Sequence, residues 1–169
     1  MRPSVTRLRP DCAWLAENRA EFILQPKLNG DRVVLWIERD GWTAQNRHGS
    51  RYSFRIRNAA DFAALPSGTV LDGEVIGSNF YPFDVLRIGD LDLTGAPVEN
   101  RIGAVKSLCA ACRVEWRYSE PTPAQLVQWE TDYPLTREVE GVVAKRKGSK
   151  YQIHAKPFHE ADDWLKFKW

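Results

Sequence analysis

Cysteine and long apolar runs are scarce in this 169-residue sequence. Its three cysteines are an odd number, which argues against a framework of disulfides as the basis of the fold. The apolar stretches, such as Val33–Ile37, are far shorter than the ~18 residues that a membrane span needs. The basic residues Arg2, Arg7 and Arg9 lead into no apolar signal region. We therefore expect no membrane partner and a cytoplasmic location.

An excess of one charge is also missing, because 24 Lys and Arg stand against 22 Asp and Glu, a net charge of +2. The overall charge predicts no polyanionic partner, so any such site must come from local clusters. With 43% hydrophobic and 27% charged residues, the chain has the composition of one globular domain over residues 1–169.

The pair Cys109-x-x-Cys112 lacks a second pair of ligands at the spacing of a structural zinc site. Cys12 and the three histidines are the other candidate donors, and none stands at a paired spacing. We therefore interpret Cys109 and Cys112 as part of the small, apolar face of a helix.

Alternating apolar residues and β-branched side chains predict strands, and longer periods with capping residues predict helices. The expected strands are Glu21–Lys27, Arg32–Glu38, Gly41–Asn46, Thr69–Ile76, Phe80–Leu86, Val114–Tyr118, Gly141–Arg146 and Trp164–Lys168. The expected helices are Asp11–Ala20, Ala59–Leu65, Glu99–Arg113 and Pro123–Trp129, with Asn58 and Thr122 as candidate caps. This order, with a turn at Arg39-Asp40-Gly41, predicts an α+β fold in which antiparallel β-sheets pack with helices. The tryptophans Trp14, Trp36, Trp42, Trp116 and Trp129 are expected in the core or half-buried on strands.

The first of five informative segments is Gln25–Arg32, between two predicted strands. A turn at Asn29-Gly30 would present Lys27, and Arg32 would begin the next strand near the same space. A guanidinium there suits a phosphate or a ribose. Taken alone, however, a Lys and an Arg beside an Asn-Gly turn are more often a solvated hairpin tip.

The second segment is Asp72-Gly73-Glu74, in which two carboxylates flank a glycine within a stretch of strand formers. Burial of that strand would bring Glu74 toward the interior. The third contains Phe83 and Asp84, which fall on opposite faces of a strand, so that Phe83 could stack on a base. Each segment alone also fits an ordinary core strand with its turn.

The fourth segment, Glu140–Arg146, and the fifth, Trp164–Trp169, place charges within apolar strands. Alternation sends Lys166 and Lys168 to one face of the fifth segment and its apolar residues to the other. Two ammonium groups close together repel each other, so this face favours a bound anion. The alternative is a terminal edge strand that its lysines keep soluble.

The five segments occur in a fixed order: Lys-x-Asn-Gly-x-Arg, Asp-Gly-Glu, Phe-Asp-Val-Leu, Glu-Gly-Val-Val-x-Lys and Trp-Leu-Lys-x-Lys. The ordered set resembles the covalent nucleotidyltransferases, namely DNA ligases, RNA ligases and messenger-RNA capping enzymes. It is most similar to ATP-dependent DNA ligases and covers the chain from Gln25 to Trp169. The segment Asn46-Arg47-x-Gly49 is similar to a further ligase segment that meets the nick phosphate. The resemblance implies an ATP-grasp-like nucleotidyltransferase (adenylation) domain over residues 1–169.

The resemblance also implies a reaction, in which Lys27 attacks the α-phosphorus of ATP to give lysyl-AMP and pyrophosphate. AMP would then pass to a 5′-phosphate end of a nicked duplex DNA, and a 3′-hydroxyl would complete the joining. A lysine amine is protonated at neutral pH and attacks only after losing a proton. Burial and nearby cations, including Arg32, Lys166, Lys168 and a bound Mg²⁺, would favour that loss. Arginine could not substitute for Lys27, because a guanidinium stays protonated.

The site residues implied by the resemblance fall into three groups. Glu74 contacts the ribose, Phe83 and Val143 cover the two faces of adenine, and the α-phosphate is gripped by the lysines of the last strand. The implied nucleotide-binding residues are Gln25, Lys27, Arg32, Glu74, Phe83, Val143, Lys166 and Lys168; Glu74 and Glu140 are implied Mg²⁺ ligands. For nucleic acid, the clusters Arg47–Arg57 and Lys145–Lys150 predict phosphate contacts by Arg47 and Lys145.

Two departures from the ligase pattern stand out. Asn29 replaces the usual Asp, keeping a hydrogen-bonding group but losing its charge. The sequence also stops after the Lys-x-Lys segment, so we expect a domain without the C-terminal OB-fold domain, which a partner could supply. The alternatives are an RNA ligase or capping-type transferase, and a catalytically weak module that binds nucleotide or nucleic acid.

Overall fold

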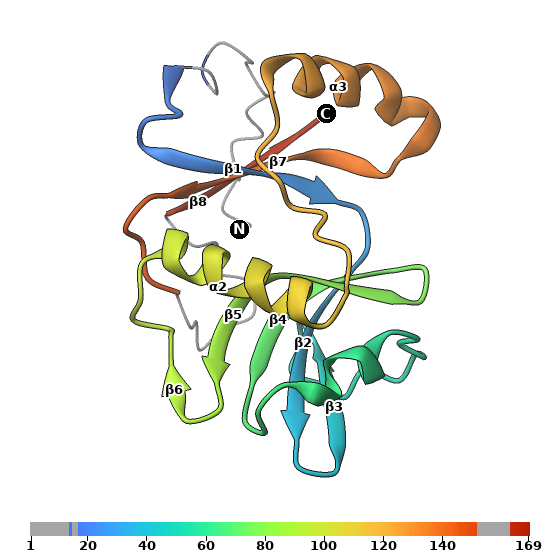
Figure 1. The fold of residues 1–169 in the computed structure, drawn as a ribbon. Helices are drawn as coiled ribbons and strands as arrows, with labels where there is room; N and C mark the ends of the chain where they lie inside the picture. The colour runs from blue at the N-terminus through green and yellow to red at the C-terminus, as the bar shows by residue number, and fades with distance from the viewer. Residues whose placement is uncertain (1–13, 15–16, 152–162) are drawn as a thin grey trace, which may run out of the picture. The chain divides into compact units, whose positions relative to one another are not determined.

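A computed structural model describes residues 14, 17–151 and 163–169 (Figure 1). By its internal contacts the chain divides into two compact units. The first unit takes the described parts of Met1–Asn29, Tyr118–Lys147 and Glu160–Trp169. The second unit takes those of Gly30–Arg117 and Gly148–His159. The prediction of one nucleotidyltransferase domain over residues 1–169 stays a prediction.

The first unit is built on a three-stranded antiparallel sheet in the order β1 (Phe22–Leu28), β7 (Val139–Arg146), β8 (Trp164–Lys168). One face of the sheet is apolar and packs against helix α3 (Pro123–Thr136). Its buried residues are Phe22, Leu24, Leu126, Val142, Ala144 and Phe167, with Trp14 and Trp129 packed against them. Alternation along the three strands therefore places the polar residues Gln25, Lys27, Lys166 and Lys168 on the second face, together with apolar residues such as Val143.

Helix α3 begins as predicted, with a capping box in which the Thr122 side chain accepts from the Gln125 backbone and the Gln125 side chain accepts from Thr122. The helix runs seven residues past the predicted end at Trp129, to Thr136. Its last two turns are largely exposed, with Leu135 at 88%, so they need no apolar periodicity to remain helical. Pro134 lies inside the helix, which ends at the left-handed C-cap Arg137 (φ 51°).

The second unit is built on a five-stranded antiparallel sheet in the order β3-β2-β4-β5-β6. The strands are β2 (Asp31–Glu38), β3 (Gly41–Asn46), β4 (Val70–Ile76), β5 (Asn79–Ile88) and β6 (Leu91–Asp92). Helix α2 (Val98–Ala111) and the 3₁₀ helix η1 (Ala59–Ala64) contribute to one core with this sheet. Cys109 is buried in that core and Cys112 packs against it, as the predicted apolar helix face requires. The prediction of an α+β fold with antiparallel sheets is confirmed.

Three local predictions are wrong. Residues Val114–Tyr118 form no strand, because they pair with no strand of either described sheet. Asn58 does not cap η1 with its side chain, which instead exchanges two hydrogen bonds with the Phe80 backbone at 2.7 and 2.8 Å. Trp42 is 36% exposed on the outer strand β3 and lies outside the core.

Half of the predicted helix at Asp11–Ala20 lies outside the described residues. Within the described part of the chain, no helix has the length and hydropathy needed to cross a membrane.

Candidate functional site

The register of the first unit's sheet places the predicted residues on one face. Gln25 of β1 pairs with Val143 of β7, which pairs with Lys166 of β8. One step along the strands, Lys27 pairs with Gly141, which pairs with Lys168. Residues that pair directly share a face, so these side chains lie on the face opposite the core that α3 covers.

A β-bulge brings Glu140 to this face. Lys27 pairs with Gly141 but Leu28 pairs with Val139, which leaves Glu140 as the extra residue of β7. Gly141 has a φ of +153°, and a Cβ at this position would lie 1.8 Å from the Phe167 carbonyl oxygen. Only glycine fits this close approach. The Glu-Gly pair in the sequence therefore has a geometric reason: the glycine permits the bulge that carries the carboxylate.

Glu140 is shared by two lysines. The Lys27 ammonium donates to its Oε1, and Lys168 Nζ donates to its Oε2 at 3.0 Å. The side chains of Lys27 and Glu140 are 19% and 14% exposed, whereas Lys168 is 46% exposed. Burial disfavours ionisation of Glu140, but the two lysine hydrogen bonds outweigh it and hold its pKa below the ordinary value. Two ammonium groups and one carboxylate leave this cluster with one excess positive charge.

The neighbouring pair, Gln25 and Val143, is uncharged. Gln25 is buried, and its Nε2 has no hydrogen-bond partner within the described part of the chain. Val143 beside it offers an apolar surface. An unsatisfied amide next to an apolar side chain suits a ligand with a flat apolar face and polar edge atoms.

Lys145 lies further along the same face, opposite Ile23 and Trp164. It is buried, with Nζ 4.0 Å from the centroid of the Trp164 ring. Lys145, which was predicted to contact nucleic acid, is therefore buried in a cation–π contact and is not exposed to a phosphate.

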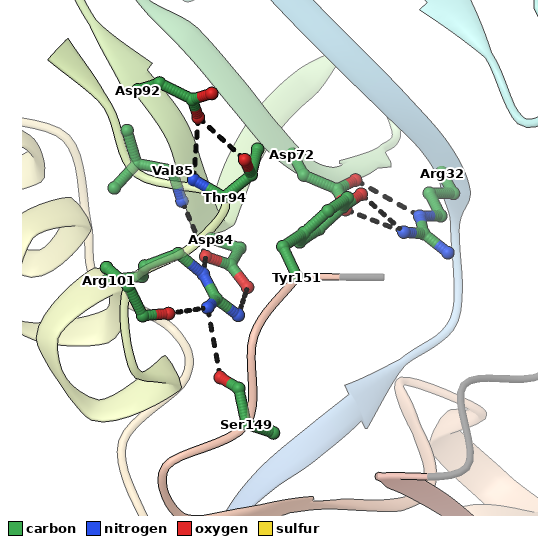
Figure 2. A network of polar contacts seen from close by, with 10 residues as sticks. Arg32, Asp72, Asp84, Val85, Asp92, Thr94, Arg101, Ser149 and Tyr151 are labelled. Atoms are coloured by element: carbon green, nitrogen blue, oxygen red, sulfur yellow. Dashed lines mark hydrogen bonds and ion pairs between the residues drawn. The ribbon is translucent and has the colours of Figure 1, made fainter. Parts of the chain in front are cut away.

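In the second unit, Arg32 makes a bidentate ion pair with Asp72 (Figure 2). Its Nε and Nη2 donate to the two carboxylate oxygens at 3.1 and 2.7 Å. Asp72 is fully buried while Arg32 is 40% exposed, so the guanidinium presents an open edge. The Asp72 charge raises the pKa of Arg32 above its ordinary value. The cation lies 5.7 Å from the centroid of the Phe83 ring, which brings two of the predicted nucleotide-binding residues together.

Glu74 faces Arg32 in the strand register and is half-buried. Gly73, between the two carboxylates, has a packing role, because a Cβ there would lie 2.6 Å from both the Phe80 ring and the Tyr81 carbonyl oxygen. Phe83 is the extra residue of a bulge in β5, since Asp72 pairs with Asp84 and Gly73 with Pro82.

Arg47 lies in the turn after β3 and is exposed, with its Nε 3.1 Å from His48 Nε2. The same loop carries exposed Arg51, Arg55 and Arg57, as the predicted basic cluster requires. Phe54, among these arginines, is 70% exposed.

The polar network of the second unit also contains three residues that were not predicted from the sequence: Tyr151, Arg101 and Ser149. Arg101 interrupts an otherwise apolar side of α2, and a charged residue at such a position indicates a buried ion pair. Tyr151 follows a basic run and stands in no periodic pattern, so only the fold shows its place.

Few of the described side chains are grouped so that they could bind a metal ion. The described residues hold no group of three or more His, Cys, Asp or Glu side chains that could enclose a metal. Mg²⁺ commonly uses one or two carboxylates together with water and substrate phosphates, so Glu140 fits as a single ligand when its lysine partners release an oxygen.

No protein-family model and no curated protein sequence matches the chain. Solved structures do match it. One is a mycobacterial DNA ligase D complexed with ATP and MES, with a TM-score of 0.70 and 21% identity over 89% of this chain. A Lig E DNA ligase, described as binding DNA with a minimal scaffold, has a TM-score of 0.60 and 18% identity over 96% of this chain and 68% of its own. A Chlorella virus DNA ligase-adenylate has a TM-score of 0.52 and 19% identity over 88% of this chain and 61% of its own.

These likenesses define the fold. The chain has the α+β fold of these DNA ligase structures. The chain spans about half the length of the ligase D structures that it matches, covering 55% and 54% of them.

Proposed function

We propose that this chain is an ATP-dependent DNA ligase adenylation domain that forms lysyl-AMP on Lys27. The observation that carries the proposal is the cluster in which Lys27 and Lys168 share the single carboxylate of Glu140. The fold of the chain supports it, because similar solved structures are described as DNA ligases, one with ATP and one as an adenylate.

Charge makes this cluster suited to a phosphate. A partly buried group with an excess positive charge is stabilised by a bound anion, and a nucleotide phosphate supplies one. Lys166, on the same face of the sheet, adds a further cation beside it. A phosphate that pairs with Lys168 would also weaken its bond to Glu140 and leave that carboxylate to Lys27 or to a metal.

The proposed first step forms one bond and breaks one. The Lys27 nitrogen attacks the α-phosphorus, the new P–N bond forms, and the bond from phosphorus to the oxygen of the β-phosphate breaks. Pyrophosphate leaves with that electron pair, and the protons lost by the ammonium pass to solvent or to the leaving group. Cations on the α-phosphate stabilise the charge that develops in such a transfer.

The base and sugar need other groups. The unsatisfied amide of Gln25 and the side chain of Val143 support an adenine contact in the first unit. Under the same proposal, Arg32, Glu74 and Phe83 of the second unit bind ribose and base. The open edge of Arg32 and the nearby Phe83 ring support this assignment.

Mg²⁺ belongs to the proposal as the ion that enters with ATP, with Glu140 and Glu74 as candidate ligands. When bound, it would neutralise charge on the phosphate oxygens.

Nucleic acid is the proposed second substrate. AMP would pass to the 5′-phosphate of a nicked duplex, and attack by the 3′-hydroxyl would join the strands and release AMP. The exposed arginines of the Arg47–Arg57 loop support a phosphate contact.

The first test is the intact mass of the protein after incubation with Mg²⁺ and ATP, or with GTP. We expect an added AMP with ATP and none after Lys27→Ala. Lys106→Ala, which removes an exposed lysine of α2, is the matched control and should leave the adduct unchanged. No adduct with either nucleotide would overturn the proposed chemistry.

The second test concerns the acceptor. A labelled nicked DNA duplex and the matching RNA duplex are incubated with the adenylated protein, and AMP transfer is read from the labelled end. We expect transfer to DNA that weakens steeply with added salt, since phosphate contacts release counterions. Transfer only to RNA would replace DNA by RNA as the substrate.

A further inference from the structure

A hydrogen-bonded network in the second unit joins Tyr151 to the Arg32–Asp72 ion pair (Figure 2). The Tyr151 hydroxyl donates to Asp72 Oδ2 at 2.8 Å and accepts from Arg32 Nη2 at 3.1 Å. One hydroxyl therefore contacts both members of the pair, and it does so at the oxygen to which Arg32 Nη2 also donates, at 2.7 Å. Moving any one of the three groups must disturb the other two.

The Tyr151 phenol is suited to donate a hydrogen bond to Asp72. Burial raises the pKa of Tyr151 far above its ordinary value, and the neighbouring Asp72 adds to the effect. The hydroxyl therefore keeps its proton at any physiological pH and remains a donor to Asp72. Asp72 is fully buried, so each hydrogen bond that it accepts offsets a large cost of desolvating its charge.

Tyr151 is itself held in place by its chain segment. Its backbone N–H donates to the Thr94 carbonyl at 2.9 Å, and the Gly148 N–H donates to Glu99 Oε2 at 2.8 Å. Arg101 of α2 donates to the Ser149 carbonyl at 3.2 Å and lies 5.7 Å from the centroid of the Tyr151 ring. Arg101 is in turn fixed by a buried ion pair with Asp84. Residues 148–151 are thus fastened to α2 and to the loop before it.

The guanidinium of Arg32 is left with a defined open side. Its Nε and Nη2 are used by Asp72 and Tyr151, and among the described residues Nη1 makes no hydrogen bond. We propose that Tyr151 is a positioning residue, which fixes Asp72 and Arg32 so that this free edge of Arg32 meets the nucleotide. The inference rests on the proposed function, because it takes Arg32 as a nucleotide contact.

The test compares Tyr151→Phe with the wild type in the rate of self-adenylation at a series of ATP concentrations. Tyr151→Phe removes two hydrogen bonds to charged groups, one to Asp72 and one from Arg32, and we expect KM for ATP to rise about tenfold. The rate at saturating ATP should change by less than about twofold, since Tyr151 acts on binding through Arg32. Tyr133→Phe is the matched control, because among the described residues the Tyr133 hydroxyl of α3 makes no hydrogen bond. An unchanged KM in Tyr151→Phe would overturn the inference.

A double-mutant cycle separates positioning from a general structural effect. In an Arg32→Ala background, Tyr151→Phe should raise KM by less than about twofold, because the group it positions is gone. The same tenfold rise in both backgrounds would show that Tyr151 does not act through Arg32. Asp72→Asn, which disturbs the same triad from its other side, should raise KM at least as much as Tyr151→Phe. Circular dichroism at the assay temperature checks that each variant is folded.

Binding of AMP, measured by calorimetry, distinguishes failure of this inference from failure of the proposed function. A wild type that binds AMP without forming the adduct overturns the proposed chemistry, and the Tyr151 comparison is then read from AMP affinity. An adduct with equal KM in wild type and Tyr151→Phe overturns the positioning role alone. A wild type that binds no nucleotide overturns both.

Discussion

The charged groups of the two units differ in how their charges are matched. In the second unit, Arg32 and Arg101 each have their own carboxylate, and both carboxylates are fully buried. In the first unit, two lysines share Glu140 and the cluster is partly open. Matched, buried pairs are stable without a ligand, whereas an unmatched cation favours a bound anion. We therefore expect the first unit to carry the reactive group and the second unit to provide positioning.

The largest effect should follow from Lys27→Arg. The variant keeps a positive charge and a donor for Glu140, but a guanidinium stays protonated and does not attack phosphorus. We expect no detectable AMP adduct by intact mass, with a melting temperature close to that of the wild type. Lys106→Arg makes the same exchange on the exposed side of α2 and should keep full activity. An adduct of normal yield on Lys27→Arg would mean that another residue is the nucleophile.

Asp84→Ala should be the most damaging change in the second unit. It leaves the fully buried Arg101 without its carboxylate, whose two hydrogen bonds are 2.9 and 3.2 Å long. Breaking such a pair lowers the free energy of unfolding by about 3–5 kcal/mol, to be measured by denaturant titration.

The matched comparison for Asp84 is Glu21→Ala in the first unit, which breaks the exposed ion pair of Glu21 with Arg146, 3.2 Å apart, and leaves Arg146 its second partner, Asp163. We expect a loss below about 1 kcal/mol there. Equal losses in the two variants would contradict the distinction between buried and open pairs.

Lys168→Ala should slow adenylation at saturating ATP without a comparable loss of stability. If Lys168 holds the α-phosphate in the transition state, its removal costs about 10²-fold in rate, as for other donors to developing charge. Rapid-quench kinetics measure this effect, and Lys106→Ala is a control at an exposed lysine of α2. A normal rate would show that Lys168 serves only to pair with Glu140.

The smallest effect concerns the pH dependence of stability. The pKa of Glu140 is lowered in the folded protein, so its ionised form stabilises the fold above the unfolded pKa. This contribution is lost as the pH falls through the folded pKa. The difference in melting temperature between wild type and Glu140→Gln should therefore be present near neutral pH and close in acid. A difference that grew toward acid pH would contradict the ion pairs with Lys27 and Lys168.

Much of this arrangement was predictable from the sequence, because strand alternation has a strict period. The strands Gly41–Asn46 and Trp164–Lys168 were predicted to the residue, and Lys168 and Phe167 fall on opposite faces as expected. Thr122 followed by Gln125 marks a capping box, which local spacing alone defines.

What could not be predicted depends on contacts between distant parts of the chain. The bulge that turns Glu140 toward Lys27 arises from the register of β1 against β7, which no local pattern encodes. Tyr151 reaches Asp72 from 79 residues along the chain. Lys145, in a basic run that resembles a solvated strand end, is instead buried against Trp164.

The most direct test of the central claim is to locate the AMP on the chain by peptide mapping of the adenylated protein. The account predicts that the modified peptide contains Lys27 and that the bond is acid-labile, as a phosphoramidate is. An AMP found on Lys168, on another lysine, or in an acid-stable linkage would contradict it.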